Sequence, residues 1–345
     1  MGVYHLAGLG RSIGAVTAAF SSLAACKELP EAATDPLFAH SGSKGEGPAA
    51  RGAVEALVLF TTREIVDDVE NCDAYEMNRA GQSSGPEYSG GGFHRALKSN
   101  LRAEIRPLAR KETGGDGNPT GRLKPVELYW CIYEDDDPVG TFERAARVMR
   151  ALRTAAGEPG RVGHEFWVNL TGGRNIINSA LQLAASLTGA PARMYYLLSA
   201  NPRCVRHTVR PVNLRTDRDR FWVDLPVVYL GFSDTHLKIM EAIGILGEDE
   251  RPVPLDELLG QMTGELANRD RLIHGYLRPL SGQRLIVRET DAHGRDVYRM
   301  GEGWARERRY LAALRHDEDN PTLRSLPELA QTQPDWFRHE QLAFD

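Results

Sequence analysis

Two short glycine-containing stretches stand where predicted strands pass into predicted helices. The first is GLGRSIG, residues 8–14, and the second is NLTGGRN, residues 169–175. The free backbone N–H groups at a helix start, together with the helix dipole, favour an anion there. Glycine lets a phosphate approach the backbone closely, and Arg11 and Arg174 could add charge-assisted contacts. The two stretches therefore predict a site for a phosphate-bearing ligand, with Thr171 and Asn175 able to hydrogen-bond a phosphate or a ribose.

A purely structural role for these stretches is the competing interpretation. Glycine between a strand and a helix often serves turn geometry alone, and Asn or Thr there is often only an N-cap. Two such junctions on one sheet, each followed by an arginine, favour a ligand. Known nucleotide motifs fit less well, because the second predicted strand ends in Thr61-Thr62-Arg63 rather than in an acidic residue. No G-x-x-x-x-G-K-[ST] sequence is present either, so neither an NAD site nor a Walker ATPase is indicated.

The first two thirds of the chain alternate between strand-like and helix-like segments. Apolar strands are expected at 3–8, 55–62, 126–134, 165–170 and 192–199, with a strand or hairpin arm at 221–230. Helices are expected at 14–29, 141–157 and 175–187. This alternation predicts an α/β fold with a Rossmann-like, mainly parallel sheet covered on both faces. In such sheets a ligand binds beyond the carboxyl ends of the strands, near the switch point of the strand order.

The pattern changes after Gly231. Three helices are expected at 235–248, 255–262 and 266–280, followed by a β-hairpin at 284–300 and a last helix at 304–315. That order describes a winged helix-turn-helix, smaller than the sheet domain. The sequence therefore predicts a ligand-sensing domain at 1–230, a winged helix-turn-helix domain at 231–316, and a polar tail without its own core at 317–345.

Composition excludes several classes of protein. The chain has 345 residues with 41% hydrophobic and 26% charged residues, which is enough for two globular domains. A net charge of −5 excludes a generally basic, histone-like protein but permits a local basic face. There is no 18-residue apolar run and no signal-peptide start, so a cytoplasmic protein without membrane contact is expected. The four cysteines form no C-x-x-C pair, and the acidic run Glu134–Asp137 fits a solvated loop, so neither metal nor cofactor is expected.

The glycine stretches also resemble a known family. NLTGGRN resembles the signature of CARF domains, the CRISPR-associated Rossmann-fold sensors, which typically read N-[LI]-T-G-G-T-K. VYHLAGLGRS, residues 3–12, resembles the first strand and ligand loop of these domains. The resemblance covers about the first 230 residues. It departs from the family at Arg174-Asn175, where Thr-Lys is commoner, so the basic side chain lies one position earlier.

This resemblance implies a homodimer that binds cyclic oligoadenylate, the second messenger of type III CRISPR systems, across its two-fold axis. A cyclic polyanion with two-fold symmetry suits two copies of one phosphate-binding face. Some CARF domains also cleave their ligand slowly by orienting a ribose 2′-hydroxyl, and Ser12, Arg11 or Arg174 could assist such a step here. The ligand-binding residues carried over by position are Gly8, Leu9, Gly10, Arg11, Ser12, Asn169, Thr171, Gly172, Gly173, Arg174 and Asn175.

Two functions compete for the C-terminal domain. The first is DNA binding, in which the third helix presents residues to a groove and Arg295 lies on the wing. Between residues 266 and 288, five arginines stand against Asp270 alone, a local charge of +4. A winged helix that only connects or dimerises domains is the structural alternative. The candidate DNA-binding residues are Asn268, Arg269, Arg271, His274 and Arg295.

The second function is RNA cleavage. Arg269 and His274 fit the R-x4-H pattern that resembles the active site of HEPN ribonucleases, where they would stabilise phosphate charge and transfer a proton. HEPN domains are all-helical, and the expected hairpin argues against one. The sequence thus favours a CRISPR-linked cyclic oligoadenylate sensor that regulates DNA binding and transcription. A ring-activated ribonuclease acting on RNA and a ring nuclease that cleaves the messenger are the alternatives.

Overall fold

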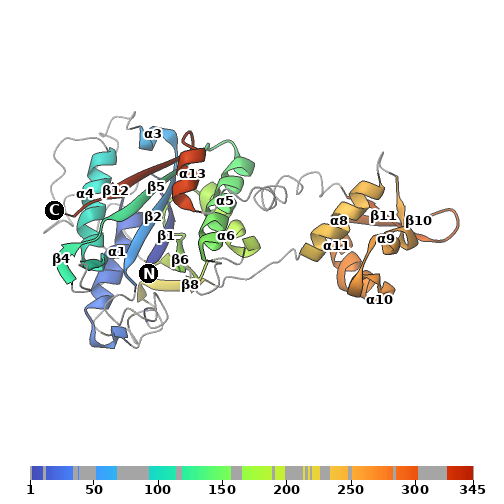
Figure 1. Cartoon of the computed structure of the whole chain (residues 1–345), viewed down its shortest axis with the longest axis horizontal. Coiled ribbons are helices and arrows are strands. Elements are labelled where there is room, and N and C mark those ends of the chain that lie inside the picture. The colour runs from blue at the N-terminus through green and yellow to red at the C-terminus, as the bar shows by residue number, and fades with distance from the viewer. Residues whose placement is uncertain are drawn as a thin grey trace. The chain divides into compact units, whose positions relative to one another are not determined.

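The chain forms two compact units. One comprises Met1–Tyr229 together with Asn320–Asp345, and the other comprises Leu230–Asp319. Figure 1 shows the computed structural model of the whole chain, and each unit is treated separately below. The structure describes residues 2–10, 13–33, 38, 52–67, 93–113, 119–156, 165–188, 191–198, 213, 217, 220–225, 234–247, 251–282, 285–301 and 325–344.

A seven-stranded sheet forms the centre of the first unit, in the order β12-β5-β2-β1-β6-β7-β8. The five inner strands are parallel, and the two edge strands run antiparallel to their neighbours. Numbered by their order in the sequence, the parallel strands lie in the sheet in the order 3-2-1-4-5, which is the Rossmann order. The expected α/β fold with a mainly parallel sheet is thereby confirmed. The strands are β1 (Val3–Gly8), β2 (Val54–Thr61), β5 (Val126–Ile132), β6 (Glu165–Asn169), β7 (Arg193–Leu197), β8 (Trp222–Leu225) and β12 (Phe337–Leu342).

Helices cover both faces of this sheet, which explains why its inner strands are almost continuously apolar. Figure 1 shows α1 (Gly14–Lys27) and α4 (Phe93–Ile105) on one side, and α5 (Pro138–Ala156) and α6 (Asn175–Thr188) on the other. Four aromatic residues of the strands are buried in the core, each at most 2% exposed: Tyr129, Trp130, Phe166 and Trp167. Smaller elements are η1 (Pro30–Ala33), α3 (Arg63–Val66), η5 (Arg106–Leu108), and the antiparallel pair of β3 (Lys111–Thr113) and β4 (Pro119–Leu123).

The C-terminal segment differs from the expected polar tail. It forms α13 (Leu326–Thr332), whose N-cap Ser325 accepts a hydrogen bond from the Glu328 backbone, and then β12, which pairs with β5. Phe337 and Leu342 at the two ends of β12 are fully buried. Between them lie polar and charged residues, as is usual for an edge strand that must not pair with another chain. Those residues gave the segment the composition of a tail.

The second unit contains a short three-stranded antiparallel sheet in the order β10-β11-β9, with helices packed beside it. Its third helical segment runs without a break from Arg269 to Gly282, including one π-helical stretch. The last helix expected, at 304–315, lies outside the described residues. In chain order the elements are α8 (Asp234–Leu246), β9 (Val253–Pro254), α9 (Leu255–Gln261), η8 (Gly264–Ala267), α10 (Arg269–Leu272), η9 (Ile273–Leu277), α11 (Arg278–Gly282), β10 (Ile286–Thr290) and β11 (Asp296–Met300).

Within the described ranges of both units, every helix is too short or too polar to cross a membrane.

Candidate functional site

The two glycine stretches meet at the switch point of the sheet. β1 and β6 are parallel neighbours, with Ala7 opposite Asn169, so the loops that follow them leave the sheet side by side. The loops touch: a Cβ atom added to Gly8 would lie 2.9 Å from the Gly172 carbonyl oxygen, and one added to Gly172 would lie 2.6 Å from the Gly8 carbonyl oxygen. These two glycines are therefore required by the close approach of two backbones.

Gly173 has a second reason to be glycine. Its φ is +85°, in the left-handed region, and a Cβ atom there would lie 2.8 Å from the Gly8 Cα atom. The backbone geometry alone thus explains why these three positions are glycine, as the structural interpretation of the sequence proposed. The two loops are therefore packed against each other at the carboxyl edge of the sheet.

The polar side chains of NLTGGRN divide into two groups. Asn169 is 1% exposed; its Nδ2 donates to the Ala15 carbonyl at 3.4 Å, and its Oδ1 accepts from the Thr171 backbone at 2.9 Å. Thr171 Oγ1 in turn accepts from the Leu197 backbone at 2.8 Å. Asn169 and Thr171 therefore hold the loop in shape. Arg174 and Asn175 are exposed at the start of α6.

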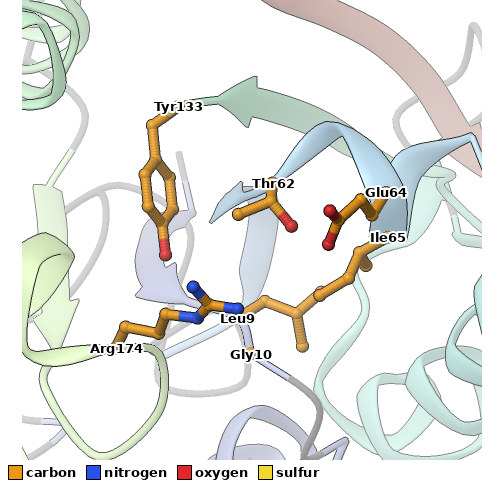
Figure 2. A pocket seen from close by; sticks show the side chains of 7 residues that line it. All are labelled: Leu9, Gly10, Thr62, Glu64, Ile65, Tyr133 and Arg174. Carbon is orange, nitrogen blue, oxygen red and sulfur yellow. The ribbon is translucent and has the colours of Figure 1, made fainter. Parts of the chain in front are cut away.

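A pocket opens beside the glycine loops (Figure 2). Its empty space is about 270 Å³, open mouth included. Because this volume counts the solvent at the open mouth, the pocket is a depression in the surface and not an enclosed cavity. It is lined by Leu9, Gly10, Thr62, Glu64, Ile65, Tyr133 and Arg174.

Three of these lining residues are among the candidates from the sequence: Leu9, Gly10 and Arg174. Arg11 and Ser12, which directly follow Gly10, lie outside the described residues. The sequence-based selection missed the other four, Thr62, Glu64, Ile65 and Tyr133. Their signal was position, because they follow the carboxyl ends of β2, which lies beside β1, and of β5, which lies beside β2.

Charge in the pocket centres on Arg174. Its guanidinium forms an ion pair with the carboxylate of Asp135, which belongs to the acidic run after β5. Another acid of that run, Asp137, accepts a hydrogen bond from the Gly140 backbone at 2.9 Å and so caps α5. These acids thus have structural partners, and no group of potential metal ligands occurs among the described residues. Burial raises the pKa of Tyr133 while Arg174 opposes that shift, so the phenol stays protonated and can donate a hydrogen bond.

In the second unit, ion pairs occupy several of the candidate arginines. Arg269 contacts Asp256 at 3.1 Å and Arg295 contacts Asp291 at 2.8 Å. Arg288 contacts Asp296 at 2.9 Å on the neighbouring strand. The local excess of positive charge counted along the sequence is therefore partly neutralised by acids from other segments.

Asn268 has a structural role in the second unit. Its Oδ1 accepts a hydrogen bond from the Arg271 backbone at 3.0 Å, which makes Asn268 the N-cap of α10. The side chains of Arg271, His274 and Arg278 are exposed at helical spacing on the third helical segment, whereas Leu272 and Leu277 are buried. Arg271, His274 and Arg278 are together called the exposed basic stripe below.

The Arg269–His274 pair is less suited to catalysis. Arg269 is paired with Asp256 of α9, and no contact between Arg269 and His274 occurs among the described residues. A π-helical stretch begins between them at Ile273. The hairpin of β10 and β11 also distinguishes this unit from an all-helical domain.

Comparisons with known proteins give limited guidance. No family model matches the chain. An uncharacterized protein of Archaeoglobus fulgidus is 28% identical over 203 residues, so the match spans 57% of this chain and 57% of that curated relative. Among solved structures, Enterococcus italicus Csm6 bound to cyclic hexa-2′-fluoro-hexa-dAMP aligns with 83% of this chain and 55% of that chain, with 9% identity and a TM-score of 0.30. The functional argument therefore rests on the residues of the site.

Proposed function

We propose that this protein is a CARF-type sensor that binds cyclic oligoadenylate at the switch-point pocket. The observation that carries the proposal is the position of Arg174. The NLTGG loop presents this arginine to a pocket that the loop after β1 also lines, at the switch point where Rossmann-like sheets bind nucleotides. The guanidinium suits a phosphate of the ring.

The chemistry of the proposed ligand supports a symmetric assembly. The ring repeats the same nucleotide unit several times, so it offers equivalent groups to more than one copy of the chain. A two-fold homodimer would present one pocket from each copy to opposite units of that ring. Arg174, Gly10 and the protonated Tyr133 would contact a phosphate, and the absence of a side chain at Gly10 would let the ring lie against the backbone there.

The second unit is the proposed output domain. Its elements follow the order helix, strand, helix, helix, strand, strand, which supports a winged helix-turn-helix. The exposed basic stripe would face DNA phosphates. Regulation would require the dimer to adopt two arrangements that bind DNA differently. Ring binding would then regulate DNA binding if the ring has different affinities for those two arrangements. The pairing of Arg269 with Asp256 and the presence of the hairpin favour this function over a HEPN-like ribonuclease.

Calorimetric titration tests the sensor. Cyclic tetra-adenylate and cyclic hexa-adenylate are compared with linear tetra-adenylate, using the full chain. One ring should bind per two chains, and Arg174→Ala should weaken binding tenfold or more, as expected for losing a charge-assisted contact of about 1.5–3 kcal/mol. Arg220→Ala is the matched control, because Arg220 is also exposed on the first unit and paired with Asp217.

Two outcomes would overturn the proposal: no binding of either ring, or an Arg174→Ala variant that keeps the affinity of the natural chain. Chromatography of the ring after incubation separates a sensor that only binds its ligand from one that also cleaves it. The variant Arg174→Ala also serves there, since a cleaving enzyme would lose turnover along with affinity.

A further inference from the structure

The wall of the pocket opposite Arg174 comes from a single turn that follows β2. Thr62 ends the extended backbone and stands at the N-cap of α3, but its side chain makes no capping hydrogen bond. Threonine at an N-cap normally accepts from the backbone of the first turn. Here the side chain lines the pocket, and Figure 2 shows the hydroxyl of Thr62 on the same side of the space as the carboxylate of Glu64.

Glu64 is exposed, and no hydrogen bond or ion pair to its side chain occurs among the described contacts. An ionised carboxylate only accepts hydrogen bonds, and beside a polyanion it is repelled by phosphate. Its place in this pocket therefore fits a ligand that brings hydrogen-bond donors as well as phosphates. A nucleotide has such donors in its ribose hydroxyls and base amino groups.

The sheet topology selects the ribose. In Rossmann sites an acidic residue at the end of the second strand accepts a hydrogen bond from a ribose hydroxyl. β2 is the second strand here, and it lies beside β1 in the sheet. The sequence alone argued against an acid at this position, because it ends the strand in Thr61-Thr62-Arg63. Glu64 is the next residue, and the start of α3 brings it to the pocket.

The turn that carries Thr62 and Glu64 is held from outside the pocket. The Arg63 guanidinium donates to the Asp335 carbonyl at 3.1 Å, and Asp67 pairs with Arg338 of β12 at 2.6 Å. Both partners belong to the C-terminal segment, which adds an edge strand to the sheet. The wall is thereby anchored at both ends before a ligand arrives, as a specificity-determining surface requires.

We propose that Thr62 and Glu64 recognise a ribose 2′-hydroxyl of the bound ring, which makes the pocket selective for ribonucleotides over deoxyribonucleotides. The inference rests on the proposed function, since it concerns the same pocket. The Glu64 carboxylate accepts the hydrogen bond of the 2′-hydroxyl, and the Thr62 hydroxyl donates to the same oxygen.

The test compares cyclic tetra-adenylate with its 2′-deoxy counterpart for each variant. The measured quantity is the ratio of the two dissociation constants, in which the general repulsion between Glu64 and phosphate cancels. The natural chain should prefer the ribonucleotide ring about tenfold or more, as a hydrogen bond to a charged group allows. Glu64→Ala should remove most of this preference for the ribonucleotide ring, and Glu64→Gln should keep part of the preference. Glu112→Ala on β3 is the control and should leave the preference unchanged.

The outcomes separate the two proposals. If the natural chain binds neither ring, the proposed function fails. If it binds the ribonucleotide ring but Glu64→Ala keeps the full ratio, the assignment of Glu64 is overturned. A Glu64→Ala variant that instead loses its discrimination against cyclic tetra-inosinate would also overturn the ribose assignment, because the carboxylate would then read the adenine amino group. Unchanged thermal unfolding of the exposed Glu64 variants shows that their fold is intact.

Discussion

Arg174 and Asp135 form an ion pair at the pocket, one following β6 and the other following β5. Arg174 also lines the pocket, as Figure 2 shows, where the proposed ligand would place a phosphate. A phosphate that binds the guanidinium must share it with the Asp135 carboxylate or replace that carboxylate. The acid therefore competes with the proposed ligand.

Asp135→Asn should raise the affinity for cyclic oligoadenylate. An exposed ion pair is worth about 0.2–1 kcal/mol, so releasing Arg174 should strengthen binding by up to about fivefold. Calorimetry with the ring that the natural chain prefers measures the change. Asp224→Asn is the control, since Asp224 pairs with Arg193 at 2.7 Å and does not line the pocket. Weaker binding by Asp135→Asn would mean that the carboxylate orients Arg174 instead.

The contact between the glycine loops predicts a stability effect. Gly173→Ala should destabilise the first unit by about 1–3 kcal/mol, because the new Cβ atom meets the Gly8 backbone and φ is positive. Urea unfolding followed by tryptophan fluorescence measures it. Gly10→Ala is the matched control: a Cβ atom there would be 3.9 Å from Gly173, an ordinary contact. Equal stability of the two variants would contradict the packing role of Gly173.

The sequence was sufficient for the parallel strands of the sheet and for the meeting of the two glycine loops. Nearly continuous apolar strands alternating with helices predict a parallel sheet, and the loops after β1 and β6 meet because the Rossmann order makes those strands neighbours. Thr62 and Tyr133 could not be selected in the same way. They carry no motif and reach the pocket only through the pairing of β2 with β1 and β5.

Side-chain partners and the edge strand were harder to predict. Counting charges between residues 266 and 288 treated Arg288 as part of an excess of positive charge. The register of β10 and β11, however, brings the carboxylate of Asp296 to its guanidinium. An asparagine can either contact a DNA base or cap a helix, and the sequence does not distinguish the two roles. In the structure Asn268 is the N-cap of α10. β12 is polar because it is an edge strand of the sheet. Its two buried end residues, Phe337 and Leu342, were therefore the only residues of the segment that indicated a packed strand.

Glu340 gives a prediction for the dependence of stability on pH. Its carboxylate accepts from Trp130 Nε1 at 3.1 Å and pairs with His94 and Lys98 of α4, tying β12 to that helix. The hydrogen bond from His94, helped by Lys98 and opposed by burial, lowers the pKa of Glu340 from its ordinary 4.5 to about 2. A lowered pKa in the folded state stabilises the protein above the unfolded value, and this contribution is lost as the pH falls from about 5 to about 2.

Glu340→Gln should therefore destabilise the first unit at pH 7 by about 1–2 kcal/mol, a value reduced for the partial exposure of the carboxylate. The difference from the natural chain should shrink as the pH is lowered towards 3. Urea unfolding at pH 7, 5 and 3 measures it, with Glu112→Gln on β3 as the control variant. A difference that stays constant over this range would show that the ionised form of Glu340 is not what stabilises the strand.

The exposed basic stripe gives the last prediction, for DNA binding. Replacing Arg271 and Arg278 together by alanine should weaken binding to duplex DNA and lower the salt slope of log K by about 2, since each lost phosphate contact removes about 0.9. Fluorescence titrations of a labelled duplex at several salt concentrations measure the slope. Arg288→Ala is the control, because Asp296 holds that guanidinium through contacts of 2.9–3.0 Å, so the slope should not change. If the double variant keeps the natural slope while the ring still binds, the third helical segment does not contact DNA. The second unit would then act as a connector or dimerisation module.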